Sequence, residues 1–200
     1  MVKLFSDNDT PYGKSLTEWS DRWWNWLCGQ PSSTNPASKE DDGKHANNCQ
    51  TFPQVHFLCG TTESGAVVRD CAVPLGKSIL MPIVCFEHSH LEIENATPRD
   101  LFNLSSEAID SYDVNNMIVS LDNEDLSPHK LRIRSPLFSM TFPRENIWKT
   151  NNEGSTTAGA DGYWIFINQI DKGKHTLHVK ATSTQKDGLG IDTTYNLSIV

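Results

Sequence analysis

The segment from Cys85 to Glu94, Cys-Phe-Glu-His-Ser-His-Leu-Glu-Ile-Glu, holds the densest group of side chains that can do chemistry. Alternate residues of a strand share one face. If the apolar run before this segment continues as a strand, His88, His90 and Glu92 project together. Two imidazoles and a carboxylate can bind one divalent metal ion. The sequence therefore predicts a metal site at these three residues, with a divalent metal as the one candidate cofactor.

The His-x-His pair, with three residues between His90 and Glu94, resembles the metal motif of cupins. The glycines that flank this motif in cupins are absent, because none lies six residues before His88 or seven after Glu94. A small cupin-like metal enzyme is therefore an alternative interpretation. Further histidines that could complete its metal site are His56, His175 and His178.

Other catalytic patterns are weaker, and no catalytic residue is assigned. Cys59 or Cys85 could form a catalytic pair with His56 or His88, but a chain with five cysteines and seven histidines offers many such combinations by chance. Among 25 acidic residues, no two stand out as a glycosidase pair. The chain also has no glycine-rich phosphate loop and no dinucleotide-binding fingerprint.

The tryptophans form a second group of candidate residues, and four of the six lie within eight positions. Trp19, Trp23 and Trp26 recur at helical spacing and predict an amphipathic helix whose indoles pack in the core. Trp24 lies off this stripe, and Trp148 lies in an expected loop. Because indole rings stack on sugars and other ligands, these two are the predicted binding residues.

This helix has clear boundaries. Ser15 and Glu18 have the spacing of a capping box, Gly29 is a typical helix stop, and Pro31 prevents continuation. We therefore expect a single domain over 1–200, divided into a helix at 11–29, a polar loop at 30–50 and a β-sandwich body at 51–200.

The remainder of the chain is predicted to be mainly β. Strand-like runs lie at 54–58, 67–73, 78–86, 116–121, 130–134, 137–142, 162–170, 175–182 and 193–200. The runs at 162–170 and 175–182 predict a hairpin, and 100–110 predicts a second short helix capped by Asp100. The expected fold is an antiparallel β-sandwich or jelly roll with a short amino-terminal Trp-rich α-helix.

The charge balance narrows the set of partners. A formal net charge of −8 argues against a broad nucleic-acid surface, which needs clustered Lys and Arg. Lys130, Arg132 and Arg134 alternate and predict a solvated strand face. The beginning of this chain shows no signal peptide, and no apolar run is long enough to span a membrane. We therefore expect a soluble protein; its compartment stays open, and a place outside the cell or in a virion is one alternative.

Five cysteines leave at least one thiol unpaired within a monomer. Cys49 lies in a polar loop and Cys71 directly precedes a turn, so these two are predicted to form a disulfide. Cys28, Cys59 and Cys85 lie in apolar contexts, where a free cysteine packs as a small hydrophobic residue.

Motifs spread over nearly the whole chain resemble one family of uncharacterised microbial and viral proteins. They are Trp19-x3-Trp23-Trp24-x-Trp26, Val55-x-Phe57-Leu58-x-Gly60-Thr61, Arg69-x-Cys71-x-Val73-Pro74-x-Gly76-Lys77-x4-Pro82, and Asp161-Gly162-Tyr163-Trp164 followed by Gly173-Lys174-His175-Thr176-Leu177-His178. The resemblance implies a shared fold and brings no activity, cofactor or site residue with it. It also implies a cysteine pair at Cys49 and Cys71.

These observations favour a non-enzymatic structural or binding protein. One concrete form is a subunit of a particle, filament or surface layer, with protein partners or self-association. The metal enzyme at His88, His90 and Glu92 is the first alternative, and a carbohydrate-binding module is the second.

Overall fold

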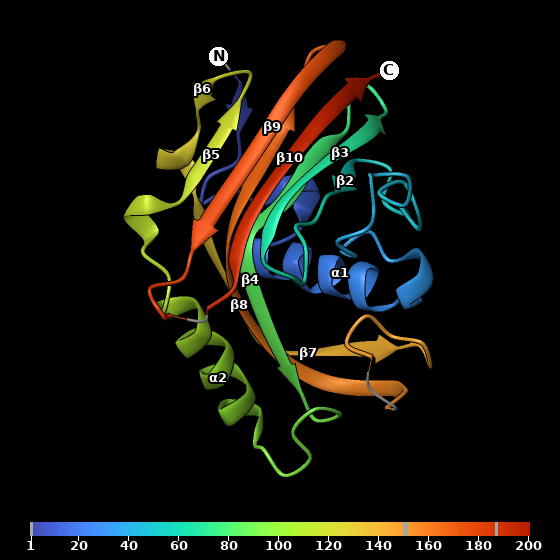
Figure 1. Cartoon of the computed structure of the whole chain (residues 1–200), viewed down its shortest axis with the longest axis vertical. Helices are drawn as coiled ribbons and strands as arrows, with labels where there is room; N and C mark the ends of the chain where they lie inside the picture. The colour runs from blue at the N-terminus through green and yellow to red at the C-terminus, as the bar shows by residue number, and fades with distance from the viewer. Residues whose placement is uncertain (1, 150–151, 187) are drawn as a thin grey trace.

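The computed structural model describes residues 2–149, 152–186 and 188–200, which form two five-stranded sheets and two α-helices (Figure 1). The first sheet contains β1 (Lys3–Leu4), β2 (Val55–Phe57), β4 (Ser78–Ser89), β7 (Leu131–Phe142) and β8 (Gly154–Gln169). The second contains β3 (Gly65–Val73), β5 (Ile118–Leu121), β6 (Glu124–Asp125), β9 (Gly173–Thr182) and β10 (Gly190–Ile199). The helices are α1 (Leu16–Cys28) and α2 (Pro98–Asp110), with short 3₁₀ turns at Pro11–Gly13, Ser32–Thr34, Val114–Asn116 and Ser127–His129. The predicted mainly β fold with a short amino-terminal helix is confirmed.

Strand order departs from the sequence-based expectation in two ways. The sheets are mixed, because β2 pairs with β4 and β3 pairs with β10 in parallel. The predicted hairpin of 162–170 with 175–182 is wrong, since β8 belongs to the first sheet and β9 to the second. The turn between them crosses from one sheet to the other, and β9 pairs instead with β10 and β5. A turn signal marks where the chain reverses and leaves open whether the next strand stays in the same sheet.

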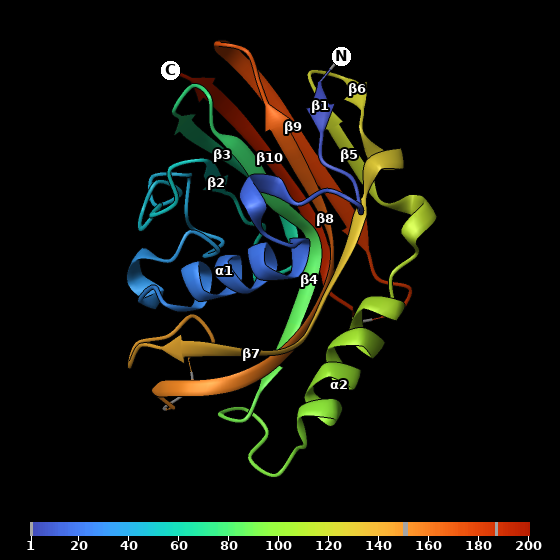
Figure 2. The ribbon, with the colours of Figure 1, turned by 180° about the vertical axis from the view of Figure 1, so that it is seen from behind.

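Three layers result from this arrangement. The inner faces of the two sheets share one apolar core, and α1 covers the opposite face of the first sheet with a second, aromatic-rich core (Figure 2). Strand β8 is therefore covered on both faces, which explains its continuous run of buried residues from Trp164 to Ile167. The ring centroids of Trp23 and Trp164 lie 5.0 Å apart in an edge-to-face contact between α1 and β8.

Helix α1 also fixes three loops through its indole N–H groups. The capping box of Ser15 and Glu18 is present as predicted. Three indoles of this helix donate to backbone carbonyl oxygens outside it at 2.8–2.9 Å: Trp19 to Pro11, Trp23 to Leu58 and Trp26 to Asn48. The helix thus orients the loops around it by directional bonds as well as by apolar burial.

Helix α2 packs on β4 and β8, on the face of the first sheet opposite α1 (Figure 2). Its cap is Thr97, with Asp100 as the acidic partner of a capping box, so the prediction of Asp100 as the cap is wrong by three positions. Gly159 of β8 lies directly under this helix. A Cβ atom there would lie 2.7 Å from the backbone nitrogen of Phe102.

A buried carboxylate ties α2 to the first sheet. The Asp161 carboxylate, with a side chain that is fully buried, accepts from Arg132 Nη2 at 2.8 Å and from Ser106 Oγ at 3.0 Å. Arg134 contacts the same carboxylate, and Arg132 also binds Asp110. Lys130, Arg132 and Arg134 were expected to form a solvated face, but Arg132 and Arg134 contact the buried Asp161.

Replacing Gly159 with alanine should destabilise the fold by about 1–3 kcal/mol, because the added methyl group must displace the backbone of α2. The matched control is Gly190→Ala, where a Cβ atom meets nothing within 4 Å. Urea unfolding of both variants measures the difference. Equal stability of the two would show that α2 does not pack this closely.

Candidate functional site

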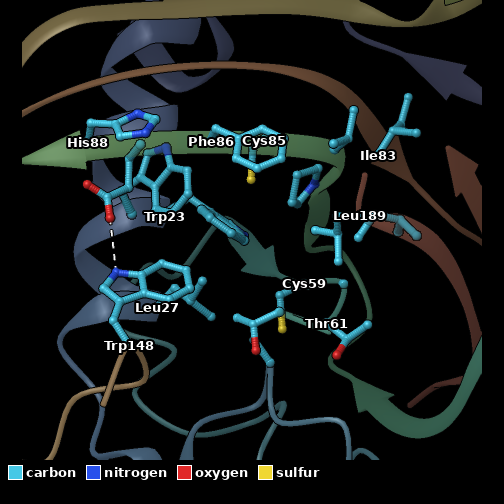
Figure 3. A pocket seen from close by; sticks show the side chains of 18 of the residues that line it. Trp23, Leu27, Cys59, Thr61, Ile83, Cys85, Phe86, His88, Trp148 and Leu189 are labelled. Carbon is cyan, nitrogen blue, oxygen red and sulfur yellow. Dashed lines mark hydrogen bonds between the residues drawn. The ribbon is translucent and has the colours of Figure 1, made fainter. Parts of the chain in front are cut away.

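A cavity of about 280 Å³ lies between α1 and one edge of β4 (Figure 3). Seven consecutive residues of β4, Pro82 to His88, line it. Helix α1 contributes Trp23, Trp24 and Leu27, and the remaining walls come from loops and the start of β10. The volume lies near the lower end of the range for small-molecule sites, roughly 300–1,000 Å³.

The cavity exists because β4 loses its neighbour. Strand β2 pairs with β4 only as far as Leu80, so the outer edge of β4 has no strand partner beyond this residue among the described residues. Leu80 O accepts a hydrogen bond from Leu58 N, so the backbone polar groups of Leu80 face this edge. The backbone of Pro82, two residues further along the strand, faces the same edge. Proline has no N–H to offer, so it is compatible with an unpaired edge. The cavity follows the edge from there.

A register shift between Pro82 and Val84 decides which side chains face the cavity. Before the shift, Ile79 and Met81 face the core between the sheets, and Leu80 faces α1. After it the faces are exchanged, and Cys85 packs against the α1 core. Without this β-bulge, the odd-numbered residues that follow, Glu87 among them, would point to the opposite face of the sheet, which the core between the sheets and α2 cover.

Glu87 is the central polar group of the site and was missed by the sequence analysis. Its exposed fraction is 6%, and its Oε1 accepts a hydrogen bond of 3.0 Å from Trp148 Nε1 (Figure 3). Its Oε2 is buried and receives no donor from the described residues. Burial, and secondly the negative charge of Glu92, raise the pKa of Glu87 well above its ordinary value and favour the neutral acid. In that form Glu87 can donate its proton to Glu92.

Trp24 and Trp148, the two predicted binding residues, line the same cavity. Trp24 is nevertheless buried, with 2% exposure, although its position off the helix stripe suggested an exposed contact. Its Nε1 is the buried indole nitrogen of α1 that has no hydrogen-bond partner within the described part of the chain. A polar group of this kind is available to a ligand.

The predicted metal ligands do not converge. Strand β4 ends at Ser89, so His88 lies in the strand while His90 and Glu92 lie in the turn that follows. His88 Nδ1 lies 2.9 Å from Ser105 Oγ of α2, and His90 Nε2 lies 2.9 Å from a backbone carbonyl oxygen. Glu92 Oε2 accepts from Ser89 N and Oγ at 2.9 and 2.7 Å. The described residues contain no group of three or more His, Cys, Asp or Glu side chains that could hold a metal ion.

All five cysteines are free thiols, which corrects the prediction of a Cys49–Cys71 disulfide. Cys71 points into the core from β3, and Cys49 is exposed in a turn. The Cys71 thiol lies 3.6 Å from His56 Nε2. Burial raises the pKa of Cys71 to about 12 and lowers that of His56 to about 4, so both groups stay neutral near pH 7. This pair therefore lacks the thiolate of a cysteine nucleophile.

One wall of the cavity is held by a buried guanidinium. Arg69, with 0% exposure, donates from Nη1 to Cys59 O at 3.0 Å and to Gly60 O at 2.7 Å. Its Nη2 donates to Ser38 O at 2.9 Å and its Nε to Asp41 O at 3.2 Å. Four carbonyl oxygens from two loops thus converge on one side chain of β3.

Comparison with known proteins leaves the site unassigned. No family model and no curated protein matches the chain. A cysteine protease inhibitor from Entamoeba histolytica is 11% identical, with 74% of this chain and 96% of that one covered and a TM-score of 0.29. The solution structure titled Amebosin is 9% identical, with 74% and 100% covered and a TM-score of 0.27. Such weak likeness carries no functional argument.

No helix within residues 2–149, 152–186 and 188–200 is long and apolar enough to cross a membrane.

The raised pKa of Glu87 predicts a pH-dependent stability. The unfolded chain releases this proton near pH 4.5 while the native protein retains it to higher pH. The native state therefore binds more protons between the two pKa values, and the free energy of unfolding falls as pH rises through that window. Glu87→Gln should flatten this decline, measured by urea unfolding between pH 4 and pH 8. Glu94→Gln, at an exposed position, is the control, and an equal decline in all three proteins would refute the assignment.

The cysteine environments predict one fast thiol in the native protein. Cys49 is exposed, whereas burial raises the pKa of Cys28 and Cys85 and brings that of Cys59 to about 11. With a thiol-specific reagent at neutral pH, Cys49 should react first and all five should react after unfolding without reductant. A total of three reactive thiols after unfolding would instead show that a disulfide forms.

Proposed function

We propose that this protein binds a small, largely apolar molecule in the cavity between α1 and the edge of β4. The observation that carries the proposal is the buried Trp24 Nε1, an indole N–H group without a partner among the described residues at the wall of a mostly apolar cavity. The Glu87 carboxyl group, which is bonded to Trp148, adds a polar group at the same wall. A buried polar group without a partner costs roughly 1–3 kcal/mol, and a ligand with matching polar atoms would recover this energy.

Binding fits the site better than the other functions considered. The thiols near the cavity are held neutral by burial, so no activated nucleophile supports an enzymatic role. Trp24 is buried and Trp148 is half-buried, so the two do not form an exposed platform, which does not favour a carbohydrate-binding module. The role as a subunit of a larger assembly stays a prediction from the sequence, where it depended on the expected all-β body and the lack of a catalytic motif.

A neutral probe tests the cavity. We expect 1-hexanol to bind saturably with a Kd of about 1 mM or below, which corresponds to about −4 kcal/mol. Ligand-observed NMR titration measures the Kd, and a thermal melt measures the stabilisation that binding produces. Absence of saturable binding would refute the proposal.

Two matched leucine variants locate the binding. Leu189 lines the cavity and is only half-buried, so Leu189→Trp should fill the space without disrupting the core (Figure 3). Leu75→Trp places the same group at an exposed position outside the cavity. The first variant should lose most of the affinity for 1-hexanol and the second should retain it. Circular dichroism and melting curves verify that both are folded, and equal affinity in the two would place the probe elsewhere.

A further inference from the structure

One of the four indoles of α1 lacks the acceptor that the other three have. The N–H groups of Trp19, Trp23 and Trp26 each donate to a backbone carbonyl oxygen at 2.8–2.9 Å. Trp24 is 2% exposed, and its Nε1 has no hydrogen-bond partner among the described residues. Trp24 also lines the cavity, so a molecule bound there can supply the missing acceptor.

The carboxyl groups at the cavity need no positively charged ligand. Glu87 Oε1 accepts a hydrogen bond of 3.0 Å from Trp148 Nε1 (Figure 3). Burial keeps Glu87 a neutral acid, which donates its proton to Glu92. The negative charge that remains lies on Glu92, whose side chain is exposed to solvent. A cation in the cavity would therefore have no buried charge to pair with.

An anion is disfavoured for a different reason. None of the described residues that line the cavity is Lys or Arg. Burial lowers the pKa of His88, which favours its neutral form. An anionic ligand would lose its hydration and approach the charge of Glu92 without a compensating cation. An uncharged ligand avoids both costs.

Most of the remaining wall is apolar. It includes Leu27 of α1, Ile83 of β4, Ile191 of β10 and Leu189 before it. An alkyl chain gains free energy when it leaves water for such a surface. The volume of about 280 Å³ restricts this chain to a short one.

We propose that the ligand of this cavity is a small uncharged carbonyl compound, a ketone or an ester, whose carbonyl oxygen accepts a hydrogen bond from Trp24 Nε1 and whose alkyl chain lies against the apolar wall. This inference rests on the proposed binding function and names its ligand class. A carbonyl oxygen is the acceptor that the other three indoles of α1 already bind. An alkene of the same shape fills the same space and leaves the indole N–H unpaired.

The first test observes Trp24 directly. In a ¹H–¹⁵N correlation spectrum of the wild type, each tryptophan gives one indole N–H signal, and the Trp24 signal is the one that Trp24→Phe lacks. Saturation with 2-hexanone should shift this proton downfield more than any other indole proton, because it gains an acceptor. 2-Methyl-1-hexene, in which a methylene group replaces the oxygen, should bind without this downfield shift.

The second test measures affinity by NMR titration at pH 7. The ratio of the Kd of 2-methyl-1-hexene to that of 2-hexanone should fall about tenfold from the wild type to Trp24→Phe. The greater hydrophobicity of the alkene affects both proteins equally and cancels in this comparison. Trp26→Phe removes an indole of the same helix that does not line the cavity, and it should keep the wild-type ratio. Hexanoate, an anion with a similar chain, should bind the wild type more weakly than 2-hexanone.

The outcomes separate the two proposals. Binding of neither the ketone nor the alkene would overturn both. Binding of both without a ketone-specific downfield shift of any indole proton, or with that shift at another indole, would overturn the carbonyl inference and leave the binding cavity standing. This result needs only the wild type when Trp24→Phe does not fold. An unchanged Kd ratio in a folded Trp24→Phe, an equal fall in Trp26→Phe, or tighter binding of hexanoate would also overturn the inference. Melting curves without ligand verify that both variants are folded.

Discussion

The register shift between Pro82 and Val84 is the constraint on which the site depends. Strand β4 is shared by both cores, so a single extra residue in it changes which layer each later side chain enters. It turns Cys85 and Glu87 toward α1 and His88 toward α2. On the opposite face a carboxyl group at this position would lie toward α2, whereas on the α1 side it accepts from the indole N–H of Trp148. This one β-bulge therefore places a polar side chain, Glu87, in the wall of a cavity that is otherwise mostly apolar.

Helix α1 supplies the other half of the site through the same residues that anchor it. The N–H groups of Trp19, Trp23 and Trp26 are satisfied by backbone carbonyls, which holds the helix in one position over the first sheet. Trp24 is buried to the same extent, but its indole N–H group at the cavity has no hydrogen-bond partner among the described residues. A helix with three bonded indoles and one free indole combines a rigid support with one available donor.

Local patterns predicted much of the fold, and the errors have physical causes. Capping residues predicted α1, and alternating hydrophobicity placed most strands, because both signals act over a few residues. The change of sheet after β8 depends on packing between distant segments and has no local signal. The side chains of His88, His90 and Glu92 do not share one strand face, because β4 ends at Ser89 and the alternation on which the predicted metal site depended stops there. Glu87 went unnoticed, although a lone carboxylate after a long apolar run was the available signal.

The cavity has walls of two different electrostatic kinds. On one side the loop at Cys59 and Gly60 is fastened by the Arg69 guanidinium, which stays charged throughout the accessible pH range. On the other side the wall centres on Glu87, whose charge is variable. A change of pH can therefore alter the charge of one wall while the contacts of Arg69 in the other wall persist. For protein engineering, the wall fixed by Arg69 is the part to preserve, and the wall around Glu87 is the part where substitutions would change the polarity of the cavity.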